Sequence, residues 1–244
     1  MSSIADHLLA VRARLERAVL DCGRDPKQVR LIAVSKTFPA EAVREAYRAG
    51  QRAFGESYVQ EAVEKLSRLQ DLRPDTEWHF IGPLQSNKAK HVAAHFDWVH
   101  SIDRLKIAQR LSDLRPAGAA ALQLCIQVNI DAQPTKSGVA PEDALDLALA
   151  VQALPRLRLR GLMCIPAPQK DPREQREVFA RLANLMHDLN RAGLQLDTLS
   201  MGMSDDLEAA VAAGATVVRV GTAIFGARPP VSAQPHSSPS SELT

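Results

Sequence analysis

The chain alternates between short apolar runs and longer stretches with helical periodicity, and this alternation limits its possible folds more than any other feature. Eight runs have the length and composition of buried strands. They span residues 30–35, 51–55, 77–82, 97–101, 122–130, 158–165, 196–201 and 216–220. Between them lie segments with an apolar stripe at helical spacing, at residues 40–50, 59–69, 86–96, 104–114, 141–154, 172–193 and 204–214.

Eight strand–helix alternations in succession predict an α/β fold, the (β/α)₈ TIM barrel. The alternative is a doubly wound open sheet. No GxGxxG motif follows the first apolar run, so the usual dinucleotide-binding motif of that alternative is missing. Residues 1–19 carry charges of both signs through an apolar stripe, which predicts an extra N-terminal amphipathic helix and not a signal peptide.

The composition indicates one globular domain over residues 1–228, followed by a tail. Residues 229–244 are rich in Pro and Ser and poor in apolar side chains, so we expect a disordered tail. The net charge of +2 comes without a basic stripe that carries aromatic residues, which argues against a nucleic-acid partner. No apolar run approaches the roughly 20 residues of a membrane span.

Metal binding and disulfide bonding find no support in the Cys and His pattern. Cys22, Cys125 and Cys164 are odd in number and far apart, which suits a reducing, cytoplasmic compartment. The three histidines of residues 91–100 lack metal-ligand spacing, and we expect no metal. These are His91, His95 and His100.

Lys36 is the first candidate for chemistry, because it follows the apolar run Leu31–Val34 and precedes Pro39. In a parallel barrel the functional site lies at the carboxyl ends of the strands. Partial desolvation there lowers the pKa of an amine, and a neutral amine can form a Schiff base with a carbonyl. The alternative is a lysine whose stem lies along the strand end while its amine reaches water.

The loops after the seventh and eighth strands are the second candidate. SMGMSDD (200–206) and VGTAIFG (220–226) offer small residues, hydroxyls and helix starts, a combination that suits a bound phosphate. The expected contacts are Ser200, Met203, Ser204, Gly221 and Thr222. The alternative is plain helix capping, with Ser204 as the N-cap.

Arg219 is the third candidate, because it interrupts the apolar eighth strand. A guanidinium inside a barrel needs a partner, since an unpaired buried charge is costly. Asp197 or Glu56 could pair with it, and so could the ring nitrogen of a bound cofactor. A reactive lysine, a phosphate site and an arginine for a ring nitrogen together indicate pyridoxal 5′-phosphate (PLP).

Several segments also resemble the pyridoxal phosphate homeostasis protein family. They are AVSKTFP (33–39), FGESYVQE (54–61), WHFIGPLQSNKAK (78–90), KSG (136–138), LSMGMSDD (199–206) and VRVGTAIFG (218–226). The resemblance implies a fold-type III PLP barrel like the N-terminal domain of alanine racemases. It also implies covalent attachment of PLP to Lys36, Arg219 at the pyridine nitrogen, and phosphate contacts from Ser200, Ser204, Gly221 and Thr222. The family commonly has Asn where this chain has Ser57, a further expected cofactor contact.

The expected function is that of a monomeric PLP carrier or buffer that maintains the cellular supply of the cofactor and hands it to PLP-requiring apo-enzymes. Racemases of this fold type take a catalytic tyrosine from a second domain, and residues 229–244 are too short to form one. A weak amino-acid racemase is the catalytic alternative, and a cofactor-free Schiff-base aldolase is a further one. One of Trp78 and His79 should line the barrel, and Lys136 should face the site.

Overall fold

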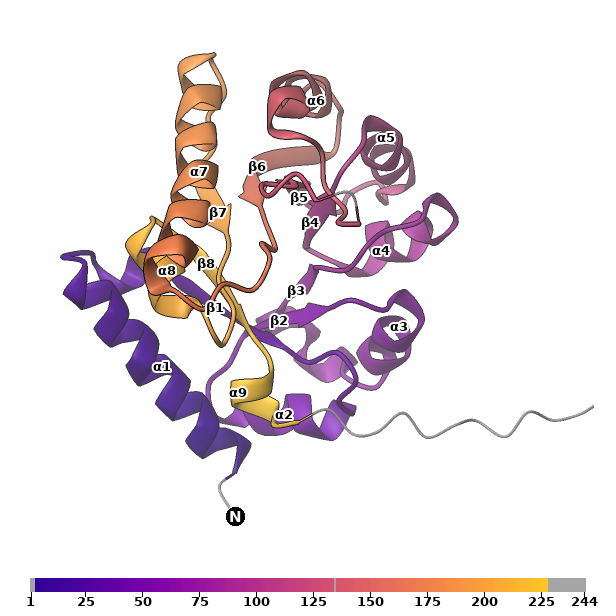
Figure 1. Ribbon diagram of the computed structural model, residues 1–244. Coiled ribbons are helices and arrows are strands. Elements are labelled where there is room, and N and C mark those ends of the chain that lie inside the picture. The colour runs from indigo at the N-terminus through magenta and orange to yellow at the C-terminus, as the bar shows by residue number, and fades with distance from the viewer. Residues whose placement is uncertain (1–2, 134, 228–244) are drawn as a thin grey trace, which may run out of the picture.

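Residues 3–133 and 135–227 of the computed structural model are described here, and they form a closed barrel of parallel strands (Figure 1). The strands pair in chain order, and the last pairs with the first. They are β1 (Arg30–Val34), β2 (Ala53–Glu56), β3 (Glu77–Phe80), β4 (Trp98–Ile102), β5 (Leu122–Gln127), β6 (Leu157–Met163), β7 (Thr198–Ser200) and β8 (Val217–Val220). The predicted (β/α)₈ barrel is therefore confirmed.

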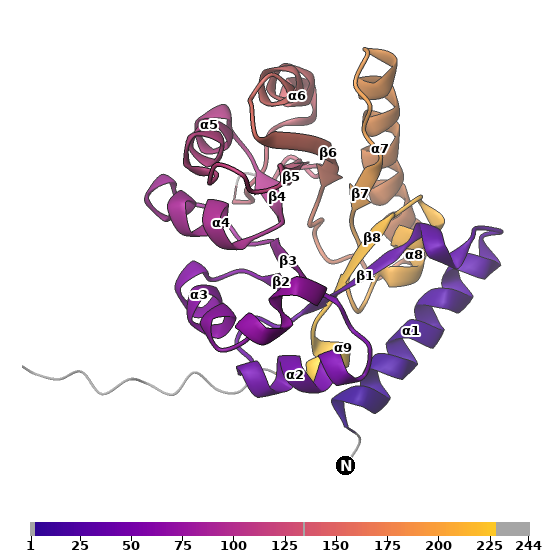
Figure 2. The same ribbon diagram turned by 180° about the vertical axis from the view of Figure 1, so that it is seen from behind.

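Helices surround the strands as an outer ring, which Figures 1 and 2 show from opposite sides. The α-helices are α1 (Ile4–Asp21), α2 (Ala40–Arg48), α3 (Val59–Ser67), α4 (Ala89–His95), α5 (Leu105–Leu114), α6 (Ala144–Gln152), α7 (Pro172–Arg191), α8 (Leu207–Ala212) and α9 (Thr222–Phe225). Short 3₁₀ turns lie at η1 (Pro26–Gln28), η2 (Gln70–Asp75), η3 (Ser86–Lys88) and η4 (Pro141–Asp143).

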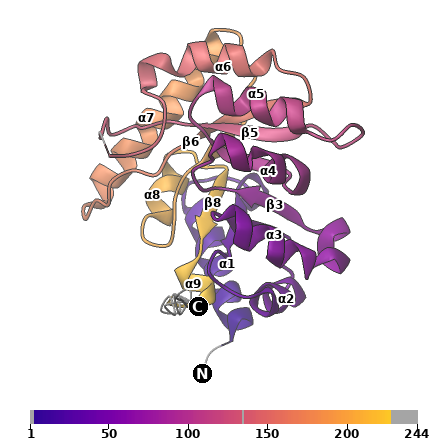
Figure 3. The same ribbon diagram turned by 90° about the vertical axis from the view of Figure 1, so that its right-hand side faces the viewer.

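The predicted N-terminal helix forms and completes this ring. Within the described residues, the helix that follows β8 is the four-residue α9, which is too short to cover the barrel between α8 and α2. Helix α1 lies across that region and contacts α2, α8 and α9, as the side view in Figure 3 also shows for α9. Its apolar stripe, which includes the buried Leu8, Val11 and Leu15, packs against the barrel layer.

The main core lies between the strands and the helices. There Phe54 stacks on Trp78 and Phe80 packs edge-on against Phe96. Inside the barrel the strands present smaller residues such as Ile32, and polar ones such as His79. Because side chains alternate along a strand, one barrel strand supplies both layers: Trp78 points outward and its neighbour His79 points inward. The expectation that one of this pair lines the barrel holds for His79.

The structure differs from the predicted elements at several ends. Residues 86–88 and 141–143 are 3₁₀ turns that precede α4 and α6. Helix α8 begins at Leu207 with Asp206 as its N-cap, so the predicted N-cap role of Ser204 is wrong. Residues 204–206 form a turn instead, in which Asp206 Oδ1 accepts a hydrogen bond from the Met203 N–H. Helix α9 was not predicted, because a single turn is too short to show periodicity.

Two further expectations concern the C-terminal tail and membrane-spanning segments. The tail at 229–244 lies outside residues 3–133 and 135–227. Within those ranges no helix combines the length and the apolar character that crossing a membrane requires.

Candidate functional site

A cavity of about 480 Å³ opens where the strands end at their carboxyl side, a size typical of small-molecule sites. The loops that follow β1, β2, β3, β6, β7 and β8 all contribute to it. Its lining is Arg14, Val34, Lys36, Phe38, Ser57, Ile81, Ile165, Met203, Ser204, Asp205, Arg219, Gly221, Thr222 and Ala223. Seven of the eight residues expected to contact a cofactor are in this set, and Ser200 is the exception.

The pairing of β1 with β8 brings the first and the last strand of the barrel together at this cavity. Ala33 lies beside Val220 in the barrel register, so the residues that follow each strand meet at the same mouth. A side chain at Gly221 would place its Cβ 3.2 Å from the carbonyl oxygen of Val34, tighter than most real contacts. Glycine at this position therefore allows the loop after β8 to approach the end of β1.

Hydrogen bonds to two carboxylates fix the residues on both sides of Lys36. Ser35 Oγ donates a hydrogen bond of 2.6 Å to Glu56 Oε1, and the Thr37 N–H donates one of 2.6 Å to Glu61 Oε1. Thr37 has φ of +69°, a left-handed conformation that is rare for a β-branched residue. Such strain persists only where the surroundings enforce it, so these bonds fix the loop that carries Lys36.

A buried lysine connects these holding groups. Lys65 is 4% exposed, and its Nζ donates to Glu56 Oε1 at 2.6 Å, to Glu61 Oε1 at 2.9 Å and to the Ser35 carbonyl oxygen at 2.8 Å. Burial raises the pKa of Glu56, although Lys65 and Ser35 oppose the shift. An ammonium has three N–H donors, so Lys65 is fully used as a structural cation.

Arg219 is also buried, but its environment is different. It is 4% exposed, and it donates from Nη1 to Ser200 Oγ at 2.6 Å and from Nη2 to the Cys164 carbonyl oxygen at 2.9 Å. Neither carboxylate considered from the sequence pairs with it. Asp197 pairs with Arg160 at 2.7 Å and Glu56 with Lys65, so these two alternatives are wrong.

Among the described residues no carboxylate lies within ion-pair distance of Arg219. Burial lowers the pKa of Arg219 from its ordinary value, yet an arginine stays charged at neutral pH. A guanidinium has five N–H donors, and two of them have protein partners here. Arg219 also lines the cavity, so it can offer hydrogen bonds to a ligand.

Ser200 lies inside the barrel and not in the loop that edges the cavity. It is fully buried, with its Oγ 2.7 Å from His100 Nδ1 as well as 2.6 Å from Arg219 Nη1. His100 in turn lies 3.0 Å from His79. A hydroxyl with these two partners is placed to support Arg219, and its position gives no support to the expected phosphate contact.

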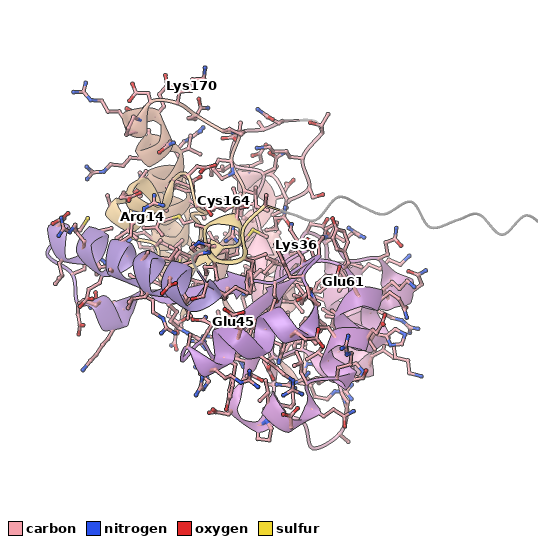
Figure 4. All side chains as sticks on the ribbon, turned by 90° about the horizontal axis from the view of Figure 1, so that it is seen from below. Arg14, Lys36, Glu45, Glu61, Cys164 and Lys170 are labelled. Atoms are coloured by element: carbon pink, nitrogen blue, oxygen red, sulfur yellow. The ribbon has the colours of Figure 1, made fainter. Side chains whose placement is uncertain are left out.

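The loop after β7 forms one edge of the cavity together with the N-terminal helix. Arg14 on α1 donates to the Ser204 carbonyl oxygen at 2.7 Å and pairs with Glu208. Figure 4 labels Arg14 and Lys36, which both line the cavity. The sequence analysis missed Arg14, because nothing in its spacing separates it from the other arginines of the helix.

Lys136 has partners within the protein and does not reach the cavity. Lys136 Nζ donates to the Ile165 carbonyl oxygen at 3.0 Å and lies 3.5 Å from Asp131, which ties the loop after β5 to the loop after β6. It is not among the residues that line the cavity. In residues 3–133 and 135–227 no three His, Cys, Asp or Glu side chains are arranged to hold a metal ion.

Lys65→Met should destabilise the protein by about 3–5 kcal/mol, because it leaves the buried Glu56 without a cation. The matched control is Arg68→Met, which breaks an exposed pair with Glu41 and should cost about 0–1 kcal/mol. Denaturant unfolding at pH 7 measures both variants. Equal losses would show that the buried lysine does not hold this region.

The loss of unfolding free energy caused by Lys65→Met should be smaller at pH 5 than at pH 7. A carboxyl whose pKa is raised by folding stabilises the folded state at low pH and loses that contribution as the pH rises through its folded pKa. Burial already raises the pKa of Glu56, and removal of Lys65 should raise this pKa further. Unfolding curves of the variant and the unchanged protein at both pH values give the difference.

Comparisons with known proteins agree with this geometry. Residues 7–229 match the family described as alanine racemase, N-terminal domain. The pyridoxal phosphate homeostasis protein of Pseudomonas aeruginosa is 60% identical over 228 residues, which cover 93% of this chain and 97% of that protein. The protein of the same name from Escherichia coli K12 is 55% identical over 229 residues, with 93% and 98% coverage.

Solved structures show the same relationship. PipY, the COG0325 family member of Synechococcus elongatus, was solved with PLP bound; it is 42% identical, has a TM-score of 0.81, and the match covers 92% of this chain and all of that one. The alanine racemase of Corynebacterium glutamicum has a TM-score of 0.66 at 17% identity, covering 90% of this chain and 60% of that one, which shows a shared fold. The resemblance seen in the sequence motifs is thereby confirmed: the chain belongs to the pyridoxal phosphate homeostasis protein family, within the wider family of the alanine racemase N-terminal domain.

Proposed function

We propose that this protein binds PLP in the cavity at the mouth of the barrel and carries or buffers it, so that the cellular supply of the cofactor is maintained. The observation that supports this best is the shared cavity: Lys36, Arg219 and the loop residues Ser204, Gly221 and Thr222 all line it. The names of the relatives and the PLP in the PipY structure support the same function.

The residues present fit the cofactor chemically. Arg219 has hydrogen-bond donors to spare and no carboxylate partner among the described residues, which suits a neutral ring nitrogen as acceptor. Three cationic side chains, those of Arg14, Lys36 and Arg219, line the cavity with one acidic side chain, that of Asp205. This balance of charge favours an anionic ligand such as a phosphate ester.

Each lining residue then has a distinct role. The bound cofactor supplies an aldehyde that condenses with amines and a ring that withdraws electrons. Lys36 Nζ is the covalent attachment point. Arg219 keeps its own proton and donates to the ring nitrogen, which leaves that nitrogen unprotonated and the ring a weak electron sink.

The phosphate lies, in this proposal, between Ser204 on one side and Gly221 and Thr222 on the other, with Arg14 behind the loop of Ser204. Met203 contributes through its side chain, because its N–H already donates to Asp206. Ser57 lines the cavity from the loop after β2 and contacts the cofactor there. Ser200 acts through Arg219 and not at the phosphate.

The lining favours a carrier over a racemase. Racemisation requires a proton acid or base on each face of the reacting carbon. Neither tyrosine is in the lining: the Tyr47 hydroxyl donates to Asp75 at 2.8 Å on the outside of the barrel, and Tyr58 is 51% exposed. Lys36 can serve one face. A weak racemase therefore remains the catalytic alternative, while a cofactor-free aldolase would lack the absorbance of bound PLP.

The wider cellular role follows from that chemistry. A protein that holds PLP without consuming it can pass it to PLP-requiring apo-enzymes, and we propose that this happens in the cytoplasm. Residues 1–228 would act as a single barrel domain and as a monomer.

Lys36→Ala should abolish the yellow absorbance of the PLP-loaded protein and the covalent label that borohydride reduction leaves behind. The physical reason is that no other amine in the cavity lining can attack the aldehyde, since arginine stays protonated. Peptide mapping of the reduced protein locates the label.

Lys88→Ala and Lys136→Ala are the matched controls, because both lysines belong to the family motifs but lie outside the lining. Both should keep the absorbance and the label. A label that maps to either of them would contradict the assignment of Lys36.

Ser204→Asp should weaken binding of PLP by at least about tenfold, because it adds a negative charge where the phosphate is expected. Binding of pyridoxal, which has no phosphate, should change little. Ser67→Asp on the exposed end of α3 is the control for added charge and should affect neither ligand. Equal losses for both ligands in Ser204→Asp would place the phosphate elsewhere.

The PLP-loaded protein, mixed with D- or L-alanine in deuterated water, should exchange the α-proton of alanine very slowly. Arg219 weakens the electron sink, and only Lys36 is assigned to proton transfer. Proton NMR follows the exchange, with free PLP and alanine as the reference. A racemisation turnover above about 1 s⁻¹, the low end of ordinary enzyme rates, would favour the racemase instead.

A further inference from the structure

A continuous row of polar side chains runs through the inside of the barrel, from the cavity to the opposite mouth. Arg219 Nη1 lies 2.6 Å from Ser200 Oγ, which lies 2.7 Å from His100 Nδ1. His100 Nε2 lies 3.0 Å from His79 Nδ1, and His79 Nε2 lies 2.8 Å from Glu77 Oε1. The row crosses strands β8, β7, β4 and β3.

The middle of this row is sealed from water. Ser200 and His100 have no exposed surface and His79 is 1% exposed, while Trp98 stacks on His79 at 5.6 Å between ring centres. Buried polar groups are costly unless each finds a partner, so a row like this must satisfy its donors and acceptors together. Apolar residues could fill the same space, and nothing in barrel packing requires two histidines there.

The acidic end of the row places a negative charge beside His79. Partial burial raises the pKa of Glu77, but His79 and Arg30 outweigh this and lower it to about 2, so Glu77 is ionised and can only accept. Its Oε1 lies 2.8 Å from His79 Nε2, but this contact lacks hydrogen-bond geometry, so Glu77 acts on the row through its charge.

The basic end of the row sets the direction of its hydrogen bonds. Ser200 donates its hydroxyl proton to His100 Nδ1, which leaves its oxygen lone pairs for Arg219, a group that can only donate. Burial lowers the pKa of His79, and it lowers that of His100 well below the ordinary value, with His79 and Arg219 adding to the effect. A neutral His100 that accepts at Nδ1 carries its proton on Nε2 and donates it to His79 Nδ1, so a neutral His79 carries its own proton on Nε2. Both rings are neutral in this pattern, because an imidazolium has no acceptor nitrogen.

We propose that this directed chain of hydrogen bonds holds the Arg219 guanidinium toward the cofactor, with Ser200 as the positioning residue and Glu77 as a remote counter-charge at the far mouth of the barrel. The inference rests on the proposed binding of PLP in the cavity. Ser200 and the Cys164 carbonyl oxygen hold Nη1 and Nη2, and because the guanidinium is planar and rigid, these two contacts fix the direction of its other N–H groups.

The direction of the chain can be tested without cofactor. Nitrogen-15 NMR of histidine-labelled, cofactor-free protein at pH 7 should show His79 and His100 both neutral and both protonated on Nε2. Variants His79→Gln and His100→Gln assign the two signals. An Nδ1-protonated or charged ring at either position in the unchanged protein would break the chain and overturn the proposal.

The positioning role of Ser200 can be tested with a pair of variants on the same strand. Ser200→Ala should weaken PLP binding roughly 10- to 100-fold, since it removes a hydrogen bond to a charged group, and it should shift the nitrogen-15 signal of the ring nitrogen in labelled PLP. Thr198→Val removes another buried hydroxyl of β7, which bonds Asp197 instead, and should leave both readouts unchanged.

Glu77, at the end of the row farthest from the cavity, allows a third test. Glu77→Gln should weaken PLP binding and move the ring-nitrogen signal in the same direction as Ser200→Ala, although Glu77 lies at the opposite mouth. Asp197→Asn breaks another ion pair, that with Arg160, and is the matched control that should do neither. An unchanged ring-nitrogen signal in both Ser200→Ala and Glu77→Gln would overturn the chain while leaving PLP binding itself intact. A failure of the unchanged protein to bind PLP would instead refute the proposed function.

Discussion

Pairing of β1 with β8 is the interaction on which the candidate site depends. Lys36 follows the first strand and Arg219 lies on the last, and only closure of the barrel places them at one cavity. Closure also sets Gly221 against the end of β1, where a larger residue would meet the Val34 carbonyl oxygen. Because all strands run parallel, the loops after them gather at one mouth, and the chemistry can be assembled there from several strands.

Two buried cations near this mouth show how the protein separates support from binding. Lys65 uses its three donors on Glu56, Glu61 and the backbone of Ser35, so it has nothing to offer a ligand and stabilises the loop of Lys36. Arg219 has five donors, of which the protein occupies two, and it borders the cavity. Two carboxylates balance the charge of Lys65. Among the described residues no carboxylate pairs with Arg219, and this difference is the main argument for a ligand at Arg219.

Much of the fold and most of the site could be predicted from the sequence, because both leave local signals. Alternation of apolar runs with helical periodicity marks a barrel, and the residue after a buried strand has a known place in it. The residues that hold the site residues in place leave no such signal in the sequence. Arg14 looks like any other arginine of its helix, and Ser200 looks like a loop hydroxyl next to a phosphate motif. Their roles depend on partners from distant strands and helices.

The sequence by itself determined the barrel, the chemical identity of Lys36 and Arg219, and the loops that edge the cavity, since each follows from residue type and position along one element. The tertiary structure decided which groups meet. It separated Arg219 from the carboxylates that could have neutralised it, and it joined Ser200 to the buried histidines in the barrel interior. The physical reason is that a hydrogen bond or ion pair depends on distances of about 3 Å between atoms, and no local pattern encodes those distances across strands.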